Sequence, residues 1–155
     1  HRIDLGESGF IGWMSLLAAD SSPAIPAQAG VYAVAYDAGR PARWANKSCG
    51  GWHKGRDPTV TADVLESNWV DGSDIVYIGK TDQSLRTRIR AFARFGQGKA
   101  VAHWGGRLVW QLPQPERLMI GWRIHGRGAA HAEEQKLFRA FYDRYDVLPF
   151  ANLRW

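Results

Sequence analysis

The sequence predicts one folded domain, spanning 1–155, that combines β-strands with α-helices. Its 155 residues, 45% of them apolar, are enough to bury a single core without disulfides or a structural metal. Two runs rich in β-branched and aromatic residues, 31–36 and 75–79, are bounded by turn residues, as strands are. Two later segments, 85–95 and 129–144, repeat apolar residues at helical spacing.

Other segments complete the expected elements. Apolar residues at helical spacing predict a short helix over 9–19. Residues 118–124 are predicted as a strand, and 108–112 as a further short strand that ends at a proline. Between the first two strands, 37–73 is irregular except for 61–67, and so much irregular chain is typical of a functional insertion or a flap.

Charge and cysteine content indicate the compartment and the class of partner. The chain has 20 Lys and Arg against 15 Asp and Glu, a net charge of +5 and an isoelectric point near 9.7, which fits a polyanionic partner. The single cysteine, Cys49, cannot form an internal disulfide, which fits a reducing cytoplasm. The uncharged stretch 8–19 is too short to cross a bilayer. We therefore expect a cytoplasmic protein without a membrane segment.

Two charged residues fall on apolar helical faces. Arg88 shares a face with the apolar residues of 85–95, and Glu134 lies near the middle of the apolar stripe of 129–144. A carboxylate in that position needs a cation, a metal or a hydrogen-bond network. Arg88 and Glu134 either form a structural pair with each other or share a pocket. In such a pocket the arginine would neutralise a phosphate and the glutamate would hold a divalent cation.

Two tripeptides link these residues to a known family. Gly30-Val31-Tyr32 and Tyr77-Ile78-Gly79 resemble the two halves of the signature of the GIY-YIG nuclease superfamily, and 84–89 resembles its helix with the catalytic arginine, here Arg88. The resemblance covers 30–152, with an insertion at 37–73. It implies an α+β fold with a small three-stranded antiparallel sheet flanked by helices. It also implies a metal-dependent endonuclease that hydrolyses DNA phosphodiester bonds.

The resemblance also implies roles for individual residues. Glu134 would bind Mg²⁺ or Mn²⁺, and Glu133 is the alternative if the helix register is shifted. Arg88 would bind the scissile phosphate through its planar guanidinium. The late asparagine of the family corresponds to Asn152, although in some members its position would fall on Asp146 here. Asn152 would hold the tyrosine or a water in place.

The two tyrosines and a histidine complete the expected catalytic set. We expect Tyr32, hydrogen-bonded to His103, to accept the proton of the attacking water, and Tyr77 to orient the phosphate or a water. A free phenol titrates near pH 10, so Tyr32 needs help from a neighbouring base or cation. Tyr32 and Tyr77 stand 45 positions apart, much further than the family's two motifs usually do. The loop between them would therefore alter which substrates reach the site.

Basic residues outside the catalytic set are candidates for nucleic-acid contacts. They are Lys54, Arg56, Lys80, Arg86, Arg90 and Arg94. Trp52 beside the insertion's basic cluster would add stacking, although Trp44, Trp52 and Trp69 could equally attach the insertion to the core. One alternative function is a non-catalytic nucleic-acid-binding module of the same fold. Another is an unrelated domain whose tryptophans form a sugar or small-molecule cleft.

Overall fold

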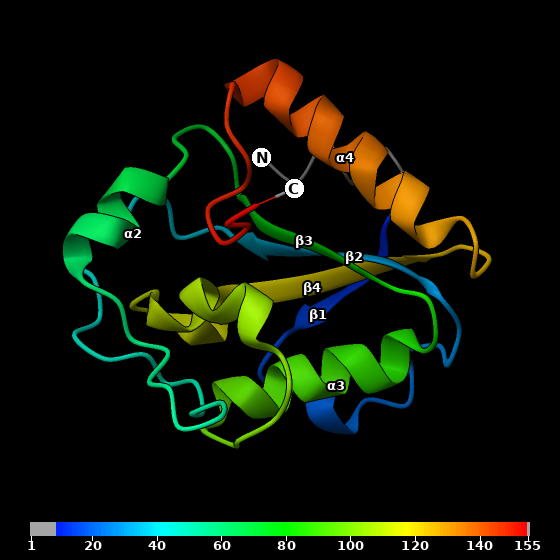
Figure 1. Ribbon diagram of the computed structural model, residues 1–155, viewed down its shortest axis with the longest axis horizontal. Helices are drawn as coiled ribbons and strands as arrows, with labels where there is room; N and C mark the ends of the chain where they lie inside the picture. Colours follow the sequence, from blue (N-terminus) through cyan, green and yellow to red (C-terminus); the bar gives the residue numbers. More distant parts are fainter. Residues whose placement is uncertain (1–8, 155) are drawn as a thin grey trace.

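The computed structural model describes residues 9–154 as a four-stranded antiparallel sheet with helices on both faces (Figure 1). The order across the sheet is β1-β4-β2-β3. The strands are β1 (Ile11–Ser15), β2 (Gly30–Tyr36), β3 (Ile75–Thr81) and β4 (Leu118–Ile124). The expected α+β class and three of these strands are confirmed. The expectation of a three-stranded sheet is wrong, because β1 adds a fourth strand at the β4 edge.

The strand β1 replaces the helix expected over 9–19. Gly12 has φ +91°, a left-handed conformation that an α-helix does not contain. A Cβ atom at Gly12 would lie 2.3 Å from the ring of Trp122, so only glycine lets the chain pass this closely over β4. The helical spacing of the apolar residues is therefore coincidental. Only a short 3₁₀ turn, η1 (Ala19–Ser21), follows β1.

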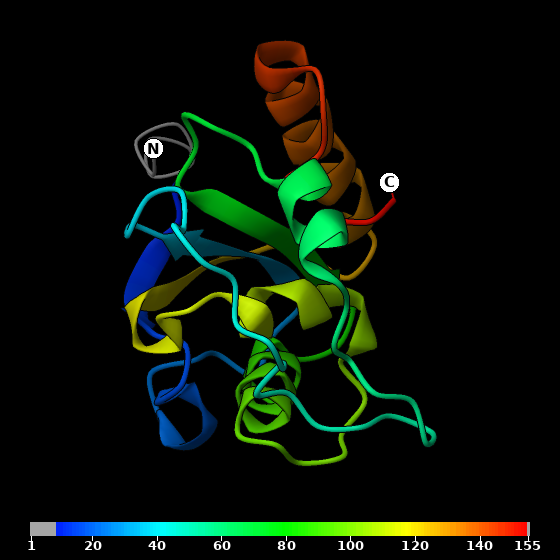
Figure 2. The ribbon, with the colours of Figure 1, turned by 90° about the vertical axis from the view of Figure 1, so that its left-hand side faces the viewer.

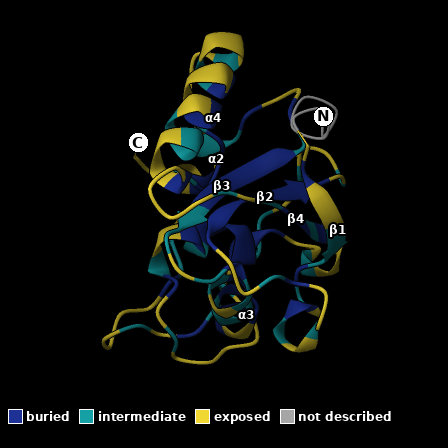
Figure 3. Cartoon of the chain, turned by 90° about the vertical axis from the view of Figure 1, so that its right-hand side faces the viewer, coloured by how far each residue is buried: buried dark blue, intermediate teal, exposed yellow. Residues whose placement is uncertain are grey.

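The central strand β2 is buried along its whole length because both of its faces are covered (Figure 3). Tyr32 and Val34 contribute to the core on the face of α3 (Leu85–Gly96), whereas Val31 and Ala33 pack on the side of α4 (Ala130–Tyr145). Both helices agree with the sequence prediction to within one residue at each end. The side chain of Ser84 caps α3 by accepting a hydrogen bond from the Thr87 amide.

A 3₁₀ helix, η2 (Trp104–Gln111), stands where a short strand was expected over 108–112. The residues from Leu108 to Gln111 are all buried, so their burial does not alternate as in a half-exposed strand. Instead, η2 packs against α3, where a Cβ atom on Gly96 would lie 2.4 Å from the Trp110 ring. The apolar run therefore reflects packing against a helix. A second short 3₁₀ turn, η3 (Pro115–Arg117), leads into β4.

The insertion at 37–73 lies along one side of the molecule and contains the helix α2 (Ala62–Asn68) (Figure 2). Trp44 stacks on Phe150 with ring centroids 5.7 Å apart. The buried Gln111 amide donates to the carbonyls of Ala45 and Val60 and accepts from the Val60 amide. Trp69 also packs on Phe150, whereas Trp52 is 56% exposed. Two of the three tryptophans thus attach the insertion to the core.

No helix within residues 9–154 has both the length and the apolar character that crossing a membrane requires.

Candidate active site

The two signature tyrosines lie on neighbouring strands and face the same side of the sheet. Tyr32 pairs with Gly79, and Val34, two residues further along β2, pairs with Tyr77. The two phenol rings are 6.2 Å apart between centroids. A Cβ atom on Gly79 would lie 2.4 Å from Tyr32 Cζ, so the glycine of the second motif makes room for the tyrosine of the first.

The hydroxyl of Tyr32 is hydrogen-bonded to the imidazole of His103. The Tyr32 oxygen lies 2.9 Å from His103 Nε2, and Nδ1 has no hydrogen-bond partner among the described residues. The imidazole is completely buried and stacks on Phe92, with ring centroids 3.8 Å apart. When the ring proton is on Nδ1, Nε2 is an acceptor for the Tyr32 proton. His103 thus lies next to the Tyr32 phenol, as the resemblance implied.

Burial keeps these groups uncharged. It lowers the pKa of His103 well below its usual value, and the positive charge of Arg88 lowers it further. Burial also raises the pKa of Tyr32, although Arg88 opposes that shift. The pKa of Tyr77 is raised well above its usual value by burial and by the nearby Tyr32. At neutral pH the site therefore contains two protonated phenols and one neutral imidazole, which is the form that accepts a proton.

Arg88 projects from α3 next to the same cluster. Its guanidinium donates to the Ala102 carbonyl at 2.7 Å, and its charge affects the pKa of Tyr32, Tyr77 and His103. It lines a cavity of about 550 Å³ together with residues from the end of β3 and the start of α3. No carboxylate among residues 9–154 forms an ion pair with Arg88. A structural pair between Arg88 and Glu134 is therefore not found, and the guanidinium is available to an anion.

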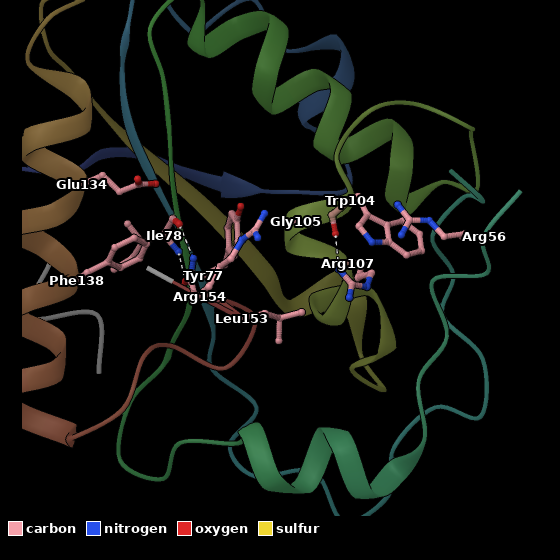
Figure 4. Close-up of a pocket in the computed structure, with 11 residues that line it drawn as sticks. Arg56, Tyr77, Ile78, Trp104, Gly105, Arg107, Glu134, Phe138, Leu153 and Arg154 are labelled. Carbon is pink, nitrogen blue, oxygen red and sulfur yellow. Dashed lines mark hydrogen bonds between the residues drawn. The ribbon is translucent and has the colours of Figure 1, made fainter. Parts of the chain in front are cut away.

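Glu134 reaches the cluster from α4, on the other side of the β3 edge. With Tyr77 it lines the main cavity, about 670 Å³ in volume, and Figure 4 shows both residues at this cavity. Among the described residues, the Glu134 carboxylate has no hydrogen bond or ion pair. Burial raises its pKa, although the charge of Lys80 opposes this. Glu133, in contrast, pairs with Arg123 and Lys136 at 3.3 Å each and lines neither cavity.

The surroundings of Glu134 fit the magnesium or manganese that the resemblance implies. Mg²⁺ binds through one or two carboxylates and keeps several waters. The half-buried Glu134 carboxylate has no protein partner among the described residues, and the cavity in front of it has room for waters. Residues 9–154 contain no group of three or more His, Cys, Asp or Glu able to enclose a metal. A divalent cation at Glu134 would therefore take most of its ligands from water and substrate.

Asn152 holds the backbone of the edge strand rather than a tyrosine. Its Oδ1 accepts from the Ile78 amide at 2.9 Å, and its Nδ2 donates to the Ile78 carbonyl at 2.8 Å. The side chain thus pairs with β3 as a neighbouring strand would, at the residue after Tyr77. Asp146, the alternative position, is exposed at the end of α4 and does not line the main cavity.

Replacing Asn152 with aspartate is expected to destabilise the protein more than any exposed Asn substitution. A carboxylate cannot donate to the Ile78 carbonyl and would repel it, so we expect a loss of about 1–3 kcal/mol in the free energy of unfolding. Urea denaturation measures this loss. Asn68→Asp is the control, because its amide contacts only an exposed helical carbonyl. Equal stability of the two variants would show that Asn152 does not support β3.

The six basic candidates for nucleic-acid contacts lie in different places. Arg56 lines the main cavity. Lys80, which is paired with Asp82, lines the cavity at Arg88, called the second cavity from here on. Arg86 and Arg90 donate to the carbonyls of Ile25 and Ser22, so they anchor the segment before β2. The other two, Lys54 and Arg94, are exposed, at the tip of the insertion and on α3.

Three further residues at the main cavity were not expected from the sequence. Trp104, Arg107 and Arg154 line it with Arg56. Figure 4 shows Trp104, Arg107 and Arg56 at the end away from Glu134, and Arg154 beside Tyr77. The guanidiniums of Arg56 and Arg107 lie over the Trp104 ring, 4.7 and 4.5 Å from its centroid. The one available signal was the run His103-Trp104-Gly105-Gly106-Arg107, in which aromatic and basic residues adjoin the histidine.

No family model, curated protein or solved structure matches this chain. Any functional proposal for it therefore depends on its own residues and their geometry.

Proposed function

We propose that this protein is a metal-dependent endonuclease that hydrolyses DNA phosphodiester bonds. The observation that carries the proposal is the meeting of five groups from distant parts of the chain in one cluster, in which Tyr77 and Glu134 line the main cavity and Arg88 lines the second cavity. They are Tyr32, Tyr77, Arg88, His103 and Glu134. A phosphodiesterase needs a proton acceptor, a cation for the phosphate and a way to stabilise the leaving oxygen, and these residues supply all three needs.

The proton of the attacking water is removed by the Tyr32–His103 pair. Tyr32 is only 1% exposed, whereas Tyr77 lines the cavity and its ring lies next to that of Tyr32, with centroids 6.2 Å apart. A proton taken from water at the cavity wall therefore has a path through the two phenols to the neutral imidazole of His103. Each phenol accepts one proton as it gives up its own, so neither needs to ionise fully. The water becomes the hydroxide that attacks phosphorus.

Arg88 binds the phosphate and also changes the pKa of His103, the proton acceptor. Its planar guanidinium donates two parallel hydrogen bonds to a phosphate, which neutralises charge that builds up in the transition state. Since the Arg88 charge lowers the pKa of His103, a phosphate anion on Arg88 offsets that effect. Substrate binding therefore makes His103 a better proton acceptor at the moment when it is needed.

Glu134 would hold the divalent cation, whose chemistry when bound is to stabilise negative charge on the leaving oxygen. Glu134 keeps its carboxylate at the cavity, on the side of β3 from which α4 approaches. Asn152 fixes the β3 backbone at Ile78, the residue after Tyr77. These two residues position the reacting groups.

A non-catalytic nucleic-acid-binding module is the second candidate, and the burial of Tyr32 and His103 favours it. Both side chains are at most 1% exposed, so a water reaches them only through Tyr77 or after a local opening. The same cavity would then bind nucleic acid without turning it over. In this case binding would be independent of Mg²⁺.

The test is strand cleavage by the purified chain. We expect nicking of DNA in Mg²⁺ or Mn²⁺ and none in EDTA, measured on single-stranded, duplex and branched substrates. Arg88→Ala is expected to lower the rate by about 100-fold or more, because it removes the charge that stabilises the phosphate. Arg43→Ala is the control, because Arg43 is an exposed arginine of the insertion that lines neither the main cavity nor the cavity at Arg88. Binding without cleavage by the wild-type chain would favour the non-catalytic module.

A further inference from the structure

The main cavity is strongly basic along its length. Arg56 from the insertion, Arg107 from η2 and Arg154 from the C-terminal segment line it, and Glu134 is the one acidic residue in the lining. Figure 4 shows Arg56 and Arg107 at the end away from Glu134 and Arg154 between them and Glu134, beside Tyr77. No carboxylate among residues 9–154 forms an ion pair with any of the three arginines. Three guanidiniums from three separate parts of the fold thus line one cavity, and none of them is paired with a carboxylate of the described residues.

Trp104 holds two of these guanidiniums in fixed positions. Arg56 and Arg107 both lie over its ring, and Arg107 also donates to the Trp104 carbonyl at 3.2 Å. Burial lowers the pKa of Arg107, and the positive charge of the nearby Arg56 lowers it further. Repulsion of this kind is relieved when an anion binds between or beside the two charges. The guanidiniums are therefore preorganised for an anionic ligand.

The insertion brings Arg56 to the cavity through several anchors. The Gly51 amide donates to the Phe95 carbonyl, and the Cys49 amide donates to the Trp110 carbonyl. His53 and Arg56 then pair through their backbones across a tight turn, in which Lys54 has φ 52°. The turn begins next to these anchors, so Arg56 faces the cavity from a supported position.

We propose that Arg56, Arg107 and Arg154 form a second phosphate subsite, which binds a backbone phosphate of the substrate strand other than the scissile one. This inference depends on the proposed function. The scissile phosphate belongs between Arg88, which lines the second cavity, and Tyr77 and Glu134, which line the main cavity. The strand extends from there along the main cavity, past Arg154, to Arg56 and Arg107. The substrate is thus a polynucleotide with several phosphates, and the insertion contributes directly to its recognition.

The experiment measures binding of a fluorescent single-stranded oligonucleotide by anisotropy, in EDTA so that no turnover occurs, over a range of salt concentrations. Arg56→Gln and Arg154→Gln are each expected to weaken binding by about 3- to 10-fold and to lower the slope of log affinity against log salt by about 0.7. Both residues are exposed, so the variants should fold. Arg43→Gln is the control, because it removes the same charge from an exposed arginine of the insertion outside the main cavity.

The outcomes separate this inference from the proposed function. If the wild-type chain cleaves DNA and the Arg56 and Arg154 variants bind like Arg43→Gln, the subsite is wrong and the nuclease proposal stands. If the wild-type chain neither binds nor cleaves DNA, the proposed function fails and the subsite fails with it. In a competition experiment, millimolar inorganic phosphate is added to each protein with bound oligonucleotide. If the same phosphate concentration displaces the oligonucleotide from the wild type and from both variants, the three arginines are not a subsite for the strand.

Discussion

Replacing Glu134 with glutamine is expected to lower magnesium-dependent cleavage by about 1,000-fold or more. The neutral amide keeps the shape of the side chain but removes the carboxylate that would hold the cation, and a bound cation contributes several kcal/mol to the transition state. Cleavage is measured under single-turnover conditions with saturating enzyme. Glu133→Gln is the matched control on the same helix. If Glu133→Gln loses cleavage and Glu134→Gln keeps it, the carboxylate has been assigned to the wrong residue.

The same Glu134→Gln change is expected to stabilise the metal-free protein at neutral pH. Burial raises the pKa of Glu134 in the folded state. The contribution of this carboxyl group to the free energy of unfolding is therefore most favourable below its unfolded pKa and is lost as the pH rises through its folded pKa. At pH 7 the ionised group is therefore at its least favourable. We expect the melting temperature in EDTA to rise by at most about 2–4 °C, which corresponds to a gain of at most about 1 kcal/mol in the free energy of unfolding. A lower melting temperature would show that the carboxylate has a stabilising partner.

Replacing Tyr32 with phenylalanine is expected to lower cleavage by about 100- to 10,000-fold, because it removes the hydroxyl that connects the cavity to His103. Tyr36→Phe is the control, since Tyr36 is equally buried on the same strand. The ring of Tyr32 remains in the core, so both variants should fold. Equal cleavage by the two variants would contradict the proton path.

The pH dependence of kcat/KM tests the partner of Tyr32. Burial and Arg88 lower the pKa of His103 well below its usual 6.5, so the neutral imidazole persists as pH falls through 6.5. It gains a proton only when the pH reaches the lowered value. The acid limb of kcat/KM, which reports the free enzyme, should therefore lie below pH 6.5. An acid limb centred at or above pH 6.5 would mean that His103 is not the proton acceptor.

The local signals in the sequence predicted the centre of the fold but not its edges. The segments that became β2, β3, β4, α3 and α4 each have a long apolar pattern that agrees with their packing. The pattern failed at Gly12, where the deciding fact is a close approach to Trp122 more than a hundred positions away. It failed again at η2, whose apolar run is buried by α3 rather than by a strand.

The same division applies to the candidate site. Arg88 and Glu134 were visible in the sequence because each breaks an apolar helical face, and such breaks need a compensating environment. The contact of Tyr32 with His103 was expected only from the resemblance, and the structure brings the two together. The basic lining of the main cavity was missed because Arg56, Arg107 and Arg154 share no local pattern. They meet only through the folding of three separate segments.

The most direct test of the account is a crystal structure of the protein with Mn²⁺ and a DNA strand, in which anomalous scattering locates the metal. The account predicts one Mn²⁺ at the Glu134 carboxylate, with a DNA phosphate on the Arg88 guanidinium and next to Tyr77. Manganese bound away from Glu134, or a strand that passes outside the main cavity, would contradict it.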